Sequence, residues 1–175
     1  MKIALVVAHQ DDEVLWHLPD PGAHVFCCST PFDDTPREGQ FVESCYRLGV
    51  TFTVLPQRAG PFVNSPVELK PGIVLTGYDM IVTHNEKGEY GHPQHIQIHN
   101  WVKNHYKGKI VTFGHGLKYA WTRTLTDAQL DRKIAALQCY RSPVPQCDGE
   151  ITWKRLVRTF YGDKLENLRY ERFVL

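Results

Sequence analysis

The chain has 175 residues, of which 42% are hydrophobic and 22% are charged, and its 20 basic and 19 acidic residues leave a formal net charge of +1. This length and composition are ordinary for a globular protein with a real core, so we expect residues 1–175 to form a single domain. No basic block stands out, which argues against nucleic acid or a membrane surface as a partner.

Strands and helices are expected to alternate along the chain. The hydrophobic pattern predicts strands at residues 2–8, 24–30, 51–55, 79–83 and 109–113, with a last strand at 170–175. It predicts helices at 12–18, 36–48, 92–106 and 126–140, the last opened by a capping box of Thr126 and Gln129. Residues 56–76, rich in proline and glycine, are expected to form a loop. This order predicts an α/β fold, a Rossmann-like three-layer domain with a mostly parallel sheet of about five strands.

The apolar run near the N-terminus and the cysteines indicate the compartment. The run at residues 3–8 is six residues long and leads into acidic residues, which is too short for the core of a signal peptide or for a membrane span. The five cysteines are odd in number and lack C-x-x-C spacing, which fits free thiols in a reducing compartment. We therefore expect a cytoplasmic protein without a membrane span.

Histidines and carboxylates follow two of the predicted strands. His9, Asp11 and Asp12 come directly after the first strand, and His92 and His95 open the helix that follows the strand at 79–83. In parallel sheets ligands bind beyond the carboxyl ends of the strands, so both groups fall where a site is expected. Imidazole and carboxylate are natural ligands of Zn²⁺ or a similar divalent metal. With an open position, such a centre could activate water for hydrolysis.

Two motifs in this order resemble one enzyme family. The sequence His-Gln-Asp-Asp-Glu at residues 9–13 resembles the AHPDDE motif of the PIG-L/LmbE-like deacetylases, zinc-dependent enzymes that remove acetyl groups from N-acetylglucosamine-type sugars. Residues 83–95 resemble the second motif of this family, which ends in Gly-His-Pro-Asp-His. The resemblance touches most of residues 1–142 and none of the 33 residues after them. Gln10 and Gln94 stand where the motifs have proline and aspartate.

The resemblance implies a role for each matching residue. It implies one Zn²⁺ per chain, held by His9, Asp12 and His95, and a small N-acetylated sugar or sugar conjugate as substrate. It also implies four residues that act on the substrate: Asp11 as general base, His92 as acid or electrostatic stabiliser, Tyr90 as hydrogen-bond donor to the oxyanion, and Arg37 as substrate-binding residue. In the family the aspartate at position 94 supports the catalytic histidine, so Gln94 should leave the pKa of His92 lower.

Several alternatives stay open. His84 either orients the metal loop or simply ends a strand, and His115 either lines the pocket or belongs to an ordinary loop. Arg37 could be a solvated residue at a helix start, and Glu13 is interpreted as a first-turn acid on the helix dipole. The rival functions are a metal hydrolase of a non-sugar amide or phosphoester, and a degenerate relative that binds a glycan or metabolite without turnover. The sequence is compatible with a homo-oligomer and leaves the oligomeric state open.

Overall fold

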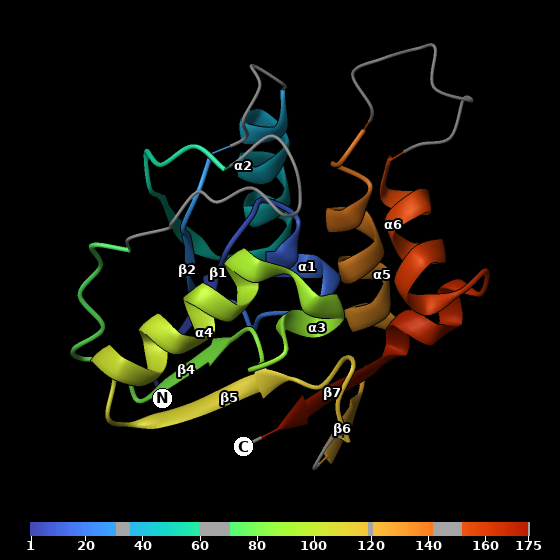
Figure 1. The fold of residues 1–175 in the computed structure, drawn as a ribbon. Coiled ribbons are helices and arrows are strands. Elements are labelled where there is room, and N and C mark those ends of the chain that lie inside the picture. The colour runs from blue at the N-terminus through green and yellow to red at the C-terminus, as the bar shows by residue number, and fades with distance from the viewer. Residues whose placement is uncertain (31–35, 60–70, 119–120, 142–151, 175) are drawn as a thin grey trace.

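A seven-stranded mixed sheet forms the centre of the fold (Figure 1). The computed structural model describes residues 1–30, 36–59, 71–118, 121–141 and 152–174. The strands are β1 (Ile3–Val7), β2 (His24–Cys27), β3 (Thr51–Val54), β4 (Met80–Thr83), β5 (Lys109–Phe113), β6 (Trp121–Thr124) and β7 (Tyr170–Val174). Their order across the sheet is β3-β2-β1-β4-β5-β7-β6. The first five strands are parallel and match the five expected ones, whereas β7 and β6 extend the sheet in antiparallel pairing.

Helices cover both faces of the sheet, which confirms the expected layered α/β architecture. The helices are α1 (Asp12–Leu15), α2 (Arg37–Leu48), α3 (Gly88–Gly91), α4 (Pro93–His105), α5 (Asp127–Leu137) and α6 (Thr152–Tyr161), with the 3-10 helix η1 (Leu165–Arg169) before β7. Helix α4 packs on one face, where Ile98 and Val102 meet Val6 and Ile81. The other face carries α1, α2, α5 and α6, so β1, β2, β4 and β5 are largely buried between two layers of helices, whereas the edge strand β3 is mostly exposed (Figure 1).

Local sequence signals explain where the helices begin and end. Helix α2 ends at Gly49, whose φ of 70° is the left-handed conformation typical of a helix C-cap. Helix α5 starts with the expected capping box, in which Thr126 and Gln129 bond each other's backbone. Helix α1 is shorter than expected and ends before Trp16. No helix in the described parts of the chain is long and apolar enough to span a membrane.

The C-terminal elements correct one expectation. No strand was predicted between the strand at 109–113 and the helix at 126–140, yet Trp121–Thr124 is an edge strand that pairs with β7. Strand β7 is held by Glu171, which accepts hydrogen bonds from the buried Lys133 ammonium (2.7 Å) and from the backbone N–H of Leu18 (2.6 Å). Four cysteines, Cys27, Cys28, Cys45 and Cys139, are buried free thiols, as expected, and Cys147 lies outside the described residues.

Candidate metal centre

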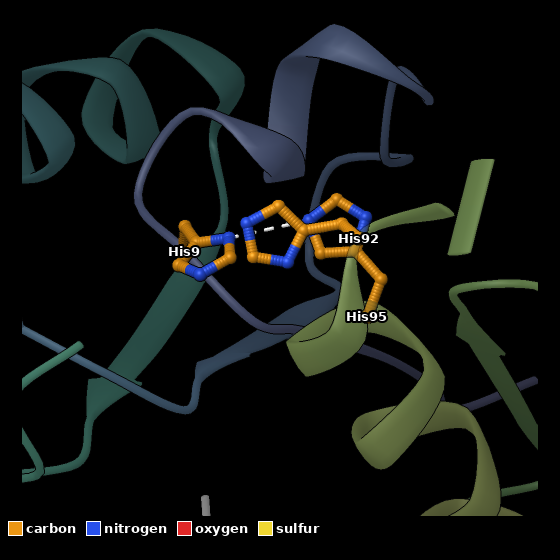
Figure 2. Close-up of side chains that lie close together, drawn as sticks. All are labelled: His9, His92 and His95. Carbon is orange, nitrogen blue, oxygen red and sulfur yellow. Dashed lines mark hydrogen bonds between the residues drawn. The ribbon is translucent and has the colours of Figure 1, made fainter. Parts of the chain in front are cut away.

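The residues of both motifs meet at the carboxyl ends of β1 and β4. The chain leads from β1 outward to β2 and β3, and then crosses back to β4 on the other side of β1. This reversal of strand order opens a crevice at the strand ends, where α/β proteins bind their ligands. His9 and Asp12 follow β1, and His95 lies in the first turn of α4. Figure 2 shows the imidazoles of His9, His92 and His95 gathered between these segments.

Three donor atoms converge on one point. The Nδ1 atom of His9 lies 3.2 Å from Nε2 of His95 and 3.3 Å from Oδ2 of Asp12. The third side of this triangle, from Nε2 of His95 to Oδ2 of Asp12, is 3.4 Å. A tetrahedral zinc site with ligand bonds of about 2.0–2.1 Å has donor atoms about 3.3–3.4 Å apart. The triangle therefore has the size of one face of such a site.

The outer atoms of the three side chains have protein partners, and these fix the tautomers. Nε2 of His9 lies 2.6 Å from Oε1 of Gln94, and Nδ1 of His95 lies 2.6 Å from Oε2 of Glu89. Each acceptor requires a proton on the ring nitrogen that faces it, so the inward nitrogens both carry lone pairs. The indole N–H of Trp16 donates to Oδ1 of Asp12 (2.8 Å).

The inward contact between His9 and His95 is consequently not a hydrogen bond between donor and acceptor. Two lone pairs and the carboxylate oxygen of Asp12 face one another at short range. Such a set of atoms repels itself unless a cation lies among them, and two imidazoles with one carboxylate suit zinc. The donor set thus fits a divalent metal ion, with the outer partners that metal-binding histidines commonly have.

Glu89 holds the histidines of the centre by hydrogen bonds, a role that was not predicted from the sequence. Its Oε2 accepts from Nδ1 of His95 (2.6 Å) and of His84 (2.8 Å), and its Oε1 accepts from the backbone N–H of Asn85 (2.9 Å). His84 in turn accepts the backbone N–H of Ala8 at Nε2 (2.9 Å). Of the two roles left open for His84, the geometry shows the orienting one. The histidine partners lower the pKa of Glu89 to about 2 against the effect of its burial.

Asp11 stands beside the three donors with its carboxylate held by Arg37. The Arg37 guanidinium lies 3.2 Å from Oδ2 of Asp11. Burial raises the pKa of Asp11 to about 6, although Arg37 opposes the shift. The backbone of Asp11 has a φ of 110°, a strained left-handed conformation for a residue with a side chain, and its N–H donates to Oε2 of Glu13 (2.8 Å).

Glu13 differs from its interpretation as a first-turn acid on the helix dipole. Its side chain is fully buried and accepts from the hydroxyl groups of Ser44 (2.7 Å) and Tyr140 (2.5 Å) as well as from the Asp11 amide. Burial raises its pKa to about 7. Glu13 thereby connects α1 to α2 and to the segment that follows α5, and fixes the turn that presents Asp11.

His92 and Tyr90 flank the three donors. Nδ1 of His92 accepts the backbone N–H of Gln94 (3.2 Å), so Nε2 is the atom that can donate. Burial, together with the neighbouring His9 and His95, lowers the pKa of His92 to about 3, which makes the ring neutral. The ring of Tyr90 lies 5.7 Å from that of His92 and is 47% exposed, and burial raises its pKa above the usual value.

The contacts of Gln94 overturn one premise taken from the family motif. We expected residue 94 to act on His92, but its side-chain oxygen contacts His9. Helix α4 begins at Pro93, and residue 94 in its first turn faces back toward the β1 loop. Nothing in the sequence indicated this contact or the role of Glu89. The sequence did indicate the hydrogen bond from Trp16 to Asp12, since the two residues are four apart at the start of a predicted helix.

Known structures share this fold. The sequence matches no family model and no curated protein. A triple mutant of a deacetylase from the teicoplanin biosynthetic pathway is similar with a TM-score of 0.60 at 10% identity, over 96% of this chain and 89% of that one. The deacetylase of the A40926 pseudoaglycone has a TM-score of 0.60 at 12% identity, over 98% and 95%. GalB, the 4-carboxy-2-hydroxymuconate hydratase of Pseudomonas putida KT2440, has a TM-score of 0.55 at 17% identity, over 91% and 84%. At these identities the comparisons show the fold alone.

Proposed function

We propose that the chain is a metal-dependent N-deacetylase of a small N-acetylated sugar or sugar conjugate, with His9, Asp12 and His95 as the ligands of one zinc ion. The observation that carries the proposal is the triangle of inward donor atoms, 3.2 to 3.4 Å apart, whose outer atoms are all bonded to protein. The two deacetylases among the structures that share the fold support the same assignment.

The surrounding residues have the chemistry that amide hydrolysis requires. A bound divalent cation would polarise the acyl oxygen and lower the pKa of water. The Asp11 carboxylate accepts the proton of the attacking water, because its pKa of about 6 leaves it ionised at neutral pH, and can return this proton to the leaving amine. Arg37 holds the Asp11 carboxylate in place. Asp11 and Arg37 thus act as base and positioning residue.

His92 and Tyr90 serve the developing oxyanion. A neutral His92 donates through Nε2 and has no second proton to release, so of its two expected roles we favour electrostatic stabilisation over acid catalysis. The raised pKa of Tyr90 keeps its hydroxyl protonated and able to donate. Gln94 was the feature that favoured a relative that binds without turnover. Its side-chain amide oxygen is the partner of Nε2 of His9, so the glutamine supports a proposed zinc ligand, which weakens that alternative.

One of the structures that share the fold is a hydratase, so the fold alone does not decide which bond water is added to. The experiment is therefore a panel assayed on the zinc-loaded protein: N-acetylglucosamine and its glycosides, non-sugar N-acetyl amides, and phosphoesters. We expect acetate release from the sugar amides. Turnover of phosphoesters or non-sugar amides alone would replace the proposal by the rival hydrolase, and bound zinc without turnover would favour a binding protein.

Metal content tests the ligands independently of activity. We expect the wild-type protein to hold one zinc ion per chain and the His95→Ala protein to lose it. His105→Ala is the matched control, because this exposed histidine lies at the other end of α4 and bonds the carbonyl oxygen of Trp101. Stoichiometric, tightly bound zinc in the His95→Ala protein would refute the ligand assignment.

A further inference from the structure

The two carboxylate oxygens of Asp12 lie in different surroundings. Oδ2 faces the candidate metal centre, 3.3 Å from Nδ1 of His9 and 3.4 Å from Nε2 of His95, and it also accepts the backbone N–H of His9 (2.9 Å). Oδ1 faces away from the histidines and accepts the indole N–H of Trp16 (2.8 Å). Trp16 follows Asp12 by four residues at the end of α1, so the helix places the indole beside the carboxylate.

Packing fixes the indole of Trp16 in this orientation. Trp16 is 3% exposed, and its ring lies 4.8 Å from that of Phe160 and 5.2 Å from that of His115. The segment of His115 is held in turn by Asn85, whose side-chain amide donates to the carbonyl oxygen of His115 (2.8 Å). A buried indole N–H requires an acceptor, so rotation of the Asp12 carboxylate away from Trp16 is disfavoured. The protein thus sets the orientation of Asp12 before a metal binds.

The hydrogen bond from Trp16 decides how many atoms Asp12 can offer to a metal. The positive hydrogen of the indole draws electron density from Oδ1 and repels a cation that approaches the same atom. With Oδ2 alone, the centre supplies two imidazole nitrogens and one oxygen, which is the ligand number of catalytic zinc sites that keep an open position. With both oxygens it would supply four ligand atoms, and the added oxygen would suit the harder Mn²⁺ ion and fill the open position.

We propose, on the basis of the proposed function, that Trp16 is a positioning residue that restricts Asp12 to binding the metal through Oδ2 alone. Trp16 thereby keeps one metal position open and favours Zn²⁺ over Mn²⁺. The residue acts through Asp12 and contacts neither the metal nor the substrate in this role. Because Phe160 of α6 packs against the indole, the C-terminal part of the chain contributes to a centre whose donor atoms all belong to residues 9–95.

X-ray absorption at the zinc edge measures the coordination directly. A carboxylate that binds through both oxygens brings its carbon atom closer to the metal than one that binds through a single oxygen. We expect the single-oxygen distance in the zinc-loaded wild type. In Trp16→Phe, which keeps an aromatic ring but lacks the N–H, we expect the shorter two-oxygen distance. Two-oxygen binding in the wild type would overturn the proposal even if the variant does not fold, and single-oxygen binding in a folded Trp16→Phe protein would also overturn it.

Metal selectivity separates the effect of the N–H from that of the ring. In chelator competition, Trp16→Phe should raise the affinity for Mn²⁺ relative to Zn²⁺ about tenfold, the lower end of the effect of losing an outer partner. Trp153→Phe, the same change at another buried tryptophan, should leave this ratio within about twofold of the wild type. Phe160→Leu keeps the indole N–H and should do the same. An equal shift in Phe160→Leu and Trp16→Phe would assign the effect to packing and overturn the proposal.

Both measurements are made without substrate, so they can be told apart from the test of the proposed function. A protein that binds zinc as expected but releases no acetate would refute the deacetylase activity and leave the role of Trp16 standing. A wild-type protein that binds no zinc would refute both.

Discussion

Glu89→Gln should weaken zinc binding although residue 89 does not face the three donor atoms. In the folded chain the two carboxylate oxygens of Glu89 accept three hydrogen bonds, from His95, His84 and the Asn85 amide. A glutamine has one oxygen and one NH₂ group. If its oxygen faces the histidines, its NH₂ group opposes the Asn85 N–H. If its NH₂ group faces them, His95 must move its proton to Nε2, which is the nitrogen that should bind the metal.

Both arrangements are costly because the group is 3% exposed. An unsatisfied buried donor costs about 1–3 kcal/mol of stability. Loss of an outer partner of a metal-binding histidine typically lowers metal affinity about 10- to 100-fold. That range corresponds to about 1.4–2.7 kcal/mol of binding free energy. We therefore expect the zinc dissociation constant of Glu89→Gln to rise by one to two orders of magnitude, with a lower Tm.

The assay is competition with a chromophoric chelator of known affinity, followed at neutral pH. Glu86→Gln is the control, since Glu86 lies in the same loop and is exposed. Circular dichroism establishes that both variants fold. A zinc dissociation constant for the Glu89 variant within about twofold of the wild type would refute the reasoning, because it would show that the tautomer of His95 does not depend on Glu89.

Three further changes test the rest of the centre. Asp11→Asn should keep zinc and lower kcat by about 10²-fold or more, the loss expected when a general base is removed; loss of zinc instead would make Asp11 a ligand. Gln94→Glu should tighten zinc binding severalfold, because a carboxylate is a better partner for the Nε2–H of His9. A lower zinc affinity of this variant in chelator competition would contradict the prediction. The pKa of Glu13 is raised from 4.5 to about 7, so its contribution to stability is complete below pH 4.5 and lost as pH rises through 7. In urea unfolding of the metal-free protein, the free energy of unfolding of the wild type should fall by about 3 kcal/mol relative to that of Glu13→Gln between pH 4 and pH 8. A difference between the two proteins that does not change with pH would contradict this prediction.

The parallel half of the fold and the chemistry of the centre could be predicted because both are local in sequence. The apolar run after Met1 has the continuous burial of a central strand, and the polar residues that end it must lie at the sheet edge. The capping box placed the start of α5 for the same reason. A signal for α6 was also present, since Trp153, Val157 and Phe160 recur at helical spacing and pack into the core.

The partners of the centre could not be predicted, because they depend on contacts between distant segments. Gln94 meets His9 across 85 residues, and Glu171 fixes β7 to residues more than 150 positions earlier. Strand β6 is four residues long and largely exposed, so its pairing with β7 rather than its own pattern makes it a strand. Sequence spacing identified which side chains could bind a metal, whereas the side chains that orient them follow from the packing.

The charges around the centre give an independent argument for a divalent cation. Asp11, Asp12 and Glu89 are buried together, and among the lysines and arginines in the described part of the chain only Arg37 forms an ion pair with one of them. The pKa of Glu89, about 2, the lowered pKa of Asp12 and the pKa of Asp11, about 6, leave all three ionised at neutral pH. Burial lowers the pKa of His84 and the neighbouring Glu89 and Asp12 raise it, but Nε2 of this ring accepts the backbone N–H of Ala8, so the ring is neutral and adds no positive charge. Buried charges must be compensated, and three carboxylates against one guanidinium leave two negative charges, the complement of a single divalent ion.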